Sequence, residues 1–141
     1  QLEGVRVGKT RFVLARSLHD TIVEEEERIA KVRRYLEEVA RRGETVTYEP
    51  VMGQIGLTYK VPQHRKLIGQ ILGIISRATF DETKDEQPLL LSALVHRKMA
   101  GASRPSPSFY ELAADLDFDV DDEEQFLHDQ MKLIWEHYRQ R

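Results

Sequence analysis

Four basic side chains stand in an interval that has no acidic residue, and they carry the strongest chemical signal in the chain. Residues 50–80 contain no Asp or Glu, yet they include Lys60, Arg65, Lys66 and Arg77. The chain as a whole is acidic, with a formal net charge of −3 over 141 residues. A local group of cations in such a chain attracts an anionic partner. The interval therefore predicts contact with nucleic acid, and we expect DNA rather than RNA.

A second basic group follows the apolar run of residues 89–95. His96, Arg97 and Lys98 come directly after it, and Arg104 lies in the next stretch, residues 100–108, which is rich in Gly, Ser and Pro. Lys and Arg neutralise phosphates, and Arg also donates two parallel hydrogen bonds to guanine. The two basic groups form one binding surface only if the fold brings them together.

The elements around these cations predict a helix-turn-helix with a basic wing. Residues 46–48 indicate a short strand and residues 49–55 a short helix that ends at Gly56. Pro62 opens a second helix with a broad apolar face, followed by a polar loop at residues 81–87 and a buried strand at residues 89–95. In a winged helix, the second helix presents its first residues to DNA while the wing lies along the backbone.

The fold class that follows is α+β and mostly helical. It has a winged-helix-like centre over residues 45–98 with a small antiparallel sheet, and long N- and C-terminal helices flank this centre. The expected nucleic-acid contacts lie at the start of the second helix, farther along it, and in the wing. They are Lys60, Gln63, His64, Arg65, Lys66, Arg77, His96, Arg97, Lys98 and Arg104.

Short motifs in this central region resemble the DNA-binding half of the alkyltransferase-like proteins. They are Gly-Glu-Thr-Val-Thr-Tyr at residues 43–48, Ile-Gly at 55–56, Val-Pro-Gln-His-Arg-Lys at 61–66, and His-Arg at 96–97. The resemblance covers about a third of the chain and implies a winged helix-turn-helix that binds DNA in the minor groove. The family's Pro-Cys-His-Arg is replaced by Leu-Val-His-Arg at residues 94–97. Without the cysteine, the resemblance implies DNA binding and no alkyl transfer.

An enzyme is one alternative to a binding protein. In a nuclease that works without a metal, His96 would act as general base and Arg97 or Lys98 would stabilise the charge that develops on the phosphate. Tyr110 and Glu111, across the loop, would complete such a site. No spacing in the sequence requires this arrangement, so we favour a non-catalytic protein.

The acidic stretch of residues 115–129 suggests another alternative. It could mimic nucleic acid or cover the basic residues, which would make the protein an interaction or inhibitor module without a nucleic-acid ligand. The simpler interpretation is that Asp119 to Glu124 favour the positive start of the last helix.

The size of the chain predicts a single domain over residues 1–141, with a strand or hairpin at 1–16 and a helical C-terminal part at 109–138. A long helix from Ser17 or Asp20 to residue 42 carries Ile22, Ile29 and Leu36 at seven-residue spacing. This narrow apolar stripe is expected to pack on the domain itself or across a homodimer.

Cysteine is absent, which excludes disulfides, thiolate metal ligands and a cysteine nucleophile. The five histidines show no metal-ligand spacing, so we expect neither a metal nor another cofactor. No run of eighteen apolar residues occurs, and the first residues do not show a basic stretch followed by an apolar one, so we expect neither a membrane span nor a signal peptide. We therefore expect a cytoplasmic protein that does not contact a membrane.

Overall fold

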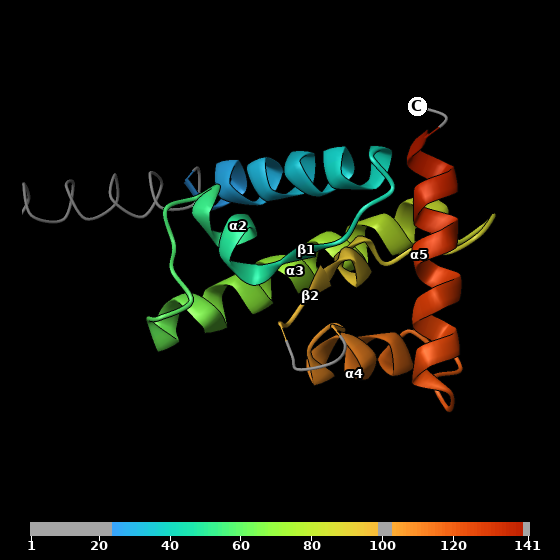
Figure 1. Cartoon of the computed structure of the whole chain (residues 1–141). Helices are drawn as coiled ribbons and strands as arrows, with labels where there is room; N and C mark the ends of the chain where they lie inside the picture. The colour runs from blue at the N-terminus through green and yellow to red at the C-terminus, as the bar shows by residue number, and fades with distance from the viewer. Residues whose placement is uncertain (1–23, 99–102, 140–141) are drawn as a thin grey trace, which may run out of the picture. The chain divides into compact units, whose positions relative to one another are not determined.

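The computed structural model describes residues 24–98 and 103–139 (Figure 1). The chain divides into two compact units, residues 1–30 and residues 31–141. In the first unit, residues 24–30 are helical. The strand or hairpin expected at residues 1–16 lies outside the described residues, as does Ile22, and the single domain stays a prediction. Everything that follows concerns the second unit.

The described residues are mostly helical, as the sequence predicts, with 68% in helices. Residues 31–41, which we call the N-terminal helix, contact the helix at the other end of the unit. Trp135 of that last helix donates its indole N–H to the Glu44 carbonyl oxygen at 3.0 Å. The elements after the N-terminal helix are β1 (Val46–Thr47), α2 (Tyr48–Gly53), α3 (Pro62–Thr83), a 3₁₀ helix (Leu91–Leu94), β2 (Val95–His96), α4 (Pro107–Asp115) and α5 (Glu123–Arg139).

The small sheet is parallel, so the predicted antiparallel sheet is wrong. β1 pairs with β2 with Val46 opposite Val95 and Thr47 opposite His96. The chain between the two strands passes through α2 and α3, and such a crossover can return the second strand in the direction of the first. Antiparallel pairing occurs at one isolated bridge, where the Arg97 amide donates to the Arg104 carbonyl oxygen at 2.8 Å.

Glycine and proline set most of the helix ends at the expected places. Gly43 ends the N-terminal helix with φ +67°, and its amide donates to the Ala40 carbonyl oxygen at 3.0 Å. Gly56 follows α2 with φ +74°, and Pro62 is the first residue of α3. α5 begins after Asp122, whose carboxylate accepts the Gln125 amide at 3.1 Å.

α3 extends through residues that the sequence suggested as a loop. It continues to Thr83 because residues 74–87 contain no Gly or Pro that would stop it. Ile68, Ile71 and Leu72 are buried as expected, but Ile74 is 49% exposed and does not belong to the core. The largest fully buried side chains also come from the N-terminal helix and from the segment after α3; they include Val32, Leu36, Val39, Leu89, Leu90, Leu91 and Leu94.

The apolar run of residues 89–95 is buried but is not the strand that the sequence predicts. It begins as extended chain, turns into the 3₁₀ helix Leu91–Leu94 and contributes only Val95 to β2. A buried backbone amide outside a helix or sheet needs another acceptor. Side chains of α3 and α5 supply these acceptors.

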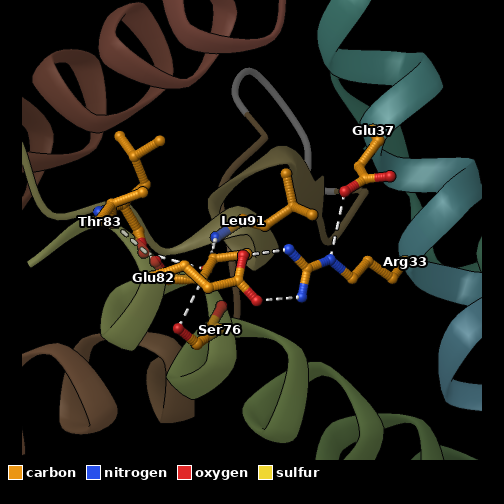
Figure 2. A network of polar contacts seen from close by, with 8 residues as sticks. Arg33, Glu37, Ser76, Glu82, Thr83 and Leu91 are labelled. Atoms are coloured by element: carbon orange, nitrogen blue, oxygen red, sulfur yellow. Dashed lines mark hydrogen bonds and ion pairs between the residues drawn. The ribbon is translucent and has the colours of Figure 1, made fainter. Parts of the chain in front are cut away.

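Hydroxyl groups on one face of α3 pair with the backbone of this buried segment (Figure 2). The Thr79 hydroxyl lies 3.0 Å from the carbonyl oxygens of both Ser76 and Leu89 and can donate its one proton to either. Four consecutive backbone amides of the segment donate hydrogen bonds to side-chain oxygens. Three of the acceptors are hydroxyls of α3: Leu89 N donates to Thr83 Oγ1 at 2.9 Å, Leu91 N to Thr79 Oγ1 at 3.3 Å and Ser92 N to Ser76 Oγ at 3.0 Å. The fourth acceptor is on α5, where Gln130 Oε1 accepts from Leu90 N at 2.9 Å. The segment is thus held between α3 and α5 by polar contacts as well as by its leucines.

An ion pair joins the N-terminal helix to the end of α3. The guanidinium of Arg33 donates to both carboxylate oxygens of Glu82 and also to Glu37 (Figure 2). The hydrogen bond from Arg33 lowers the pKa of the Glu82 carboxyl. Because Glu82 is largely exposed, we expect the ion pair to contribute little to the free energy of unfolding. Its main effect is to orient the N-terminal helix against the end of α3.

Replacing Thr79 by valine should destabilise the protein by about 1–3 kcal/mol, because a side chain of similar shape would leave the Leu89 carbonyl and the Leu91 amide unpaired in the core. Urea unfolding measures this difference. Thr45→Val is the matched control, because Thr45 is exposed, and it should change stability by less than about 0.5 kcal/mol. Equal stability of the two variants would contradict the role of the hydroxyl.

Substitution of two glycines by alanine should have opposite effects. Gly43→Ala places a Cβ on a residue with φ +67° and should cost about 1–2 kcal/mol. Gly69 lies inside α3 with open space around the position of a Cβ, so Gly69→Ala should stabilise by about 0.5–1 kcal/mol. Thermal unfolding of both variants tests whether Gly43 needs its left-handed backbone conformation and Gly69 does not. A higher melting temperature in Gly43→Ala would contradict this.

Candidate nucleic-acid interface

The turn between α2 and α3 is fixed by side-chain bonds to its backbone. The Glu49 carboxylate accepts the Tyr59 amide at 2.7 Å and the Thr58 hydroxyl at 3.3 Å. The Thr58 amide donates to Nδ1 of His64 at 3.0 Å. His64, which the sequence predicts as a nucleic-acid contact, therefore also closes the turn that leads into the basic start of α3.

Arg65 packs against the aromatic residue of this turn. Its guanidinium carbon lies 5.1 Å from the centre of the Tyr59 ring, and its Nη1 donates to the Tyr59 carbonyl oxygen at 2.7 Å. The Tyr59 residue is 39% exposed, and the ring of Tyr48 lies 6.0 Å away, tilted by 52°. A cation above an aromatic face is attracted by the ring's negative face. The pair holds one of the basic residues of α3 over an accessible aromatic surface.

A hollow of about 560 Å³ joins the turn to the second basic group. Its walls come from β1, the start of α2, the turn and the residues just after β2; they are Thr47, Tyr48, Glu49, Tyr59, Arg97 and Lys98. We call it the Tyr59 hollow. Arg65 packs on Tyr59, and Tyr59 lines the hollow with Arg97 and Lys98, so Tyr59 connects the two basic clusters that lie far apart in the sequence.

Arg97 also lines a second hollow, of about 460 Å³, whose charge is mixed. Arg104 lies there too, together with Glu111, Glu123 and the ring of Tyr110. Burial raises the pKa of the Tyr110 hydroxyl, and the carboxylate of Glu123 adds to this effect. Carboxylates beside Arg104 weaken its attraction for phosphate, so Arg104 is less suited to an anion than the residues of the Tyr59 hollow.

The Nε atom of Arg97 is buried and has no hydrogen-bond acceptor among the described residues. Leaving a buried donor unpaired costs about 1–3 kcal/mol, and more when it carries charge. Such groups in folded proteins call for an explanation, which includes a ligand or water that supplies the acceptor.

His96 lies in the core, which corrects its expected place on the surface. It is 4% exposed; its Nε2 lies 2.9 Å from the Ala93 carbonyl oxygen and its Nδ1 lies 3.1 Å from the Ser103 hydroxyl. Nε2–H donates to Ala93 in the neutral ring, which leaves Nδ1 to accept from Ser103. Burial lowers the pKa of the ring. Its two ring nitrogens thus connect β2 to the Ala93 carbonyl and to Ser103 inside the fold.

The remaining expected contacts separate into two groups. Gln63 and Lys66 are exposed at the start of α3, and Lys60 is exposed in the turn just before it. Arg77 is exposed farther along α3, where it lines a separate hollow of about 150 Å³ with Pro105 and Ser108.

Sequence reasoning did not find Tyr48, Glu49 and Tyr59. A tyrosine directly before the basic residues of α3 was the available signal, since aromatic rings interleaved with cations are typical of single-strand binding surfaces. Glu49 gave no such signal, because its role depends on the turn lying back over α2.

Two classes of feature are absent from the part of the chain that the structure describes. Nowhere in residues 24–98 and 103–139 do three His, Asp or Glu side chains gather in a way that could hold a metal ion. No helix within the same ranges has the length and apolar character needed to cross a bilayer.

Comparisons with protein-family models, with curated proteins and with solved structures found no match. The resemblance to the alkyltransferase-like proteins stays a prediction.

The stability of the protein should fall as the pH drops below about 6.5, because the unfolded chain then protonates His96 while the folded chain holds it neutral. A single group of this kind contributes at most about 1.4 kcal/mol per pH unit. Urea unfolding at several pH values between about 7 and 5 should give a shallower dependence in His96→Gln than in the unmodified protein. Identical slopes would contradict a depressed His96 pKa.

Proposed function

We propose that this protein binds nucleic acid without catalysing a reaction on it, through the start of α3 and the residues after β2. The contacts would be made by Lys60, Arg65, Lys66, Arg97 and Lys98. One observation carries the proposal: Tyr59 has Arg65 packed on its ring and lines the same hollow as Arg97 and Lys98. Tyr59 thereby links Arg65 of the first basic cluster to a hollow that is lined by Arg97 and Lys98 of the second cluster, 32 residues farther along the chain from Arg65 to Arg97.

The charges around the Tyr59 hollow suit a polyanion. α3 carries no acidic residue before Asp81, and the acidic stretch of residues 115–129 contributes no side chain to this hollow. Glu49 is the exception, and one of its oxygens is engaged by the turn. Positively charged surfaces of this kind bind phosphate backbones by releasing counterions, which makes the affinity depend steeply on salt.

The position of His96 supports a binding protein over a nuclease. Its ring is buried and its two nitrogens contact Ala93 and Ser103. The winged-helix comparison is part of this proposal, with the bridge between Arg97 and Arg104 as the base of the wing. The helix pair α2 and α3 would then correspond to the helix-turn-helix.

The double variant Arg65→Glu with Lys66→Glu should bind labelled oligonucleotides at least about tenfold more weakly, because it reverses two charges at the proposed interface. Fluorescence anisotropy at about 50 and about 200 mM salt measures both the affinity and its salt dependence, which should become shallower by roughly two phosphate contacts. Both residues are exposed, so the thermal transition should stay within a few degrees.

The matched control is Lys31→Glu with Lys132→Glu, which makes the same change in net charge on the N-terminal helix and α5. It should bind almost as well as the unmodified protein. If both double variants lost the same affinity for the oligonucleotide, the loss would be explained by net charge alone, and this result would contradict an interface at the start of α3. No binding by the unmodified protein at low salt would favour the alternative of a protein-interaction module.

A further inference from the structure

We propose that the nucleic acid is bound as a single strand, with one unpaired base held in the Tyr59 hollow. This inference rests on the proposed function and names its ligand class. It is carried by three features of the hollow: its size and aromatic walls, the placement of its one carboxylate, and the unpaired donor on Arg97.

The hollow has the dimensions and the walls that a base needs. Its volume of about 560 Å³ lies within the range of small-ligand sites, roughly 300–1,000 Å³. Tyr48 and Tyr59 supply two rings, and Tyr59 keeps 39% of its surface exposed although Arg65 packs on it. Aromatic rings stack on any base, but only when the base is free of its own helix. A paired base inside a duplex offers no such face.

The charges divide the site into a place for a base and places for phosphates. Glu49 lines the hollow and repels a phosphate from it. An ionised carboxylate can accept about four hydrogen bonds, and the turn uses one of its oxygens for Tyr59 and Thr58. The remaining capacity suits amino or imino donors at the edge of a base, which pairing would occupy in a duplex. The exposed cations of α3 and Lys98 are left for the backbone phosphates.

Arg97 supplies a donor that the protein itself does not use. Its Nε is buried and unpaired among the described residues, and the side chain forms part of the wall of the hollow. The carbonyl oxygen of an unpaired base, or a phosphate oxygen next to it, is an acceptor of the required kind. Nε is covered in the free protein, so a strand in the hollow would accept this bond only after the Arg97 side chain turns toward it.

The test compares a labelled single strand of about 12 nucleotides with a hairpin duplex that has the same number of phosphates, by anisotropy at low salt. The unmodified protein should bind the single strand more tightly. Tyr59→Ala should weaken single-strand binding about tenfold, the change expected for the loss of one stacked base, and leave duplex binding almost unchanged. Tyr59→Phe keeps the ring and should bind like the unmodified protein.

A second measurement locates the base without relying on a variant that could disturb the turn. A single strand that carries 4-thiouridine, irradiated in complex with the unmodified protein, should crosslink to the peptides containing Tyr48 or Tyr59.

The outcomes separate this inference from the proposed function. If the duplex binds as tightly as the single strand and both depend on Arg65 and Lys66, the proposed function holds and the single-strand inference is overturned. Equal losses for both ligands in Tyr59→Ala, or crosslinks only elsewhere, also overturn it. If neither ligand binds, both proposals fail.

Discussion

The buried segment after α3 imposes the constraint on which the rest of the unit depends. Its leucines fill the core, but its backbone has no sheet to join until β2. The amides must therefore be paired by side chains, and Ser76, Thr79 and Thr83 of α3 provide this on one side while Gln130 of α5 provides it on the other. These bonds fix where the chain leaves the core, and so where Arg97 and Lys98 reach the surface.

Arg97 lies where two different electrostatic environments meet. It lines the Tyr59 hollow, where Lys98 is near, and a second hollow, where Glu111 and Glu123 are near. Glu111 and Glu123 thus lie with Arg97 in the second hollow, whereas the Tyr59 hollow has Glu49 as the one carboxylate among its described lining residues. The net charge of −3 does not reveal this uneven distribution of charge, and attraction for an anion depends on the local charge.

The sequence predicted those features that depend on local chemistry. Gly43, Gly56 and Pro62 marked helix ends because their backbone preferences act without the rest of the fold. The direction of β2 and the 3₁₀ helix could not be predicted, since an apolar run reads the same in a buried strand and in a buried turn of helix. The hydroxyls of α3 at positions 76, 79 and 83 favoured the buried turn of helix over the buried strand. They place polar groups on a face of α3 that is otherwise part of the core, where they can pair with a backbone that is not in a sheet. The cations of the proposed site can be named from the sequence and their role stays a prediction, while the place of Tyr59 and the burial of His96 depend on contacts between distant segments.

The bonds that Glu49 and His64 make to the turn have a thermodynamic consequence for recognition. Loops that order only when a ligand arrives lose conformational entropy at that moment, which weakens binding. Here the Tyr59 and Thr58 amides are already engaged at 2.7 and 3.0 Å in the free protein. The turn is already ordered by these bonds, so a nucleic acid bound as proposed would lose little affinity to the ordering of this part of the chain. Association with the proposed ligand would then be limited by the encounter and orientation of the partners, without a slow folding step of the turn.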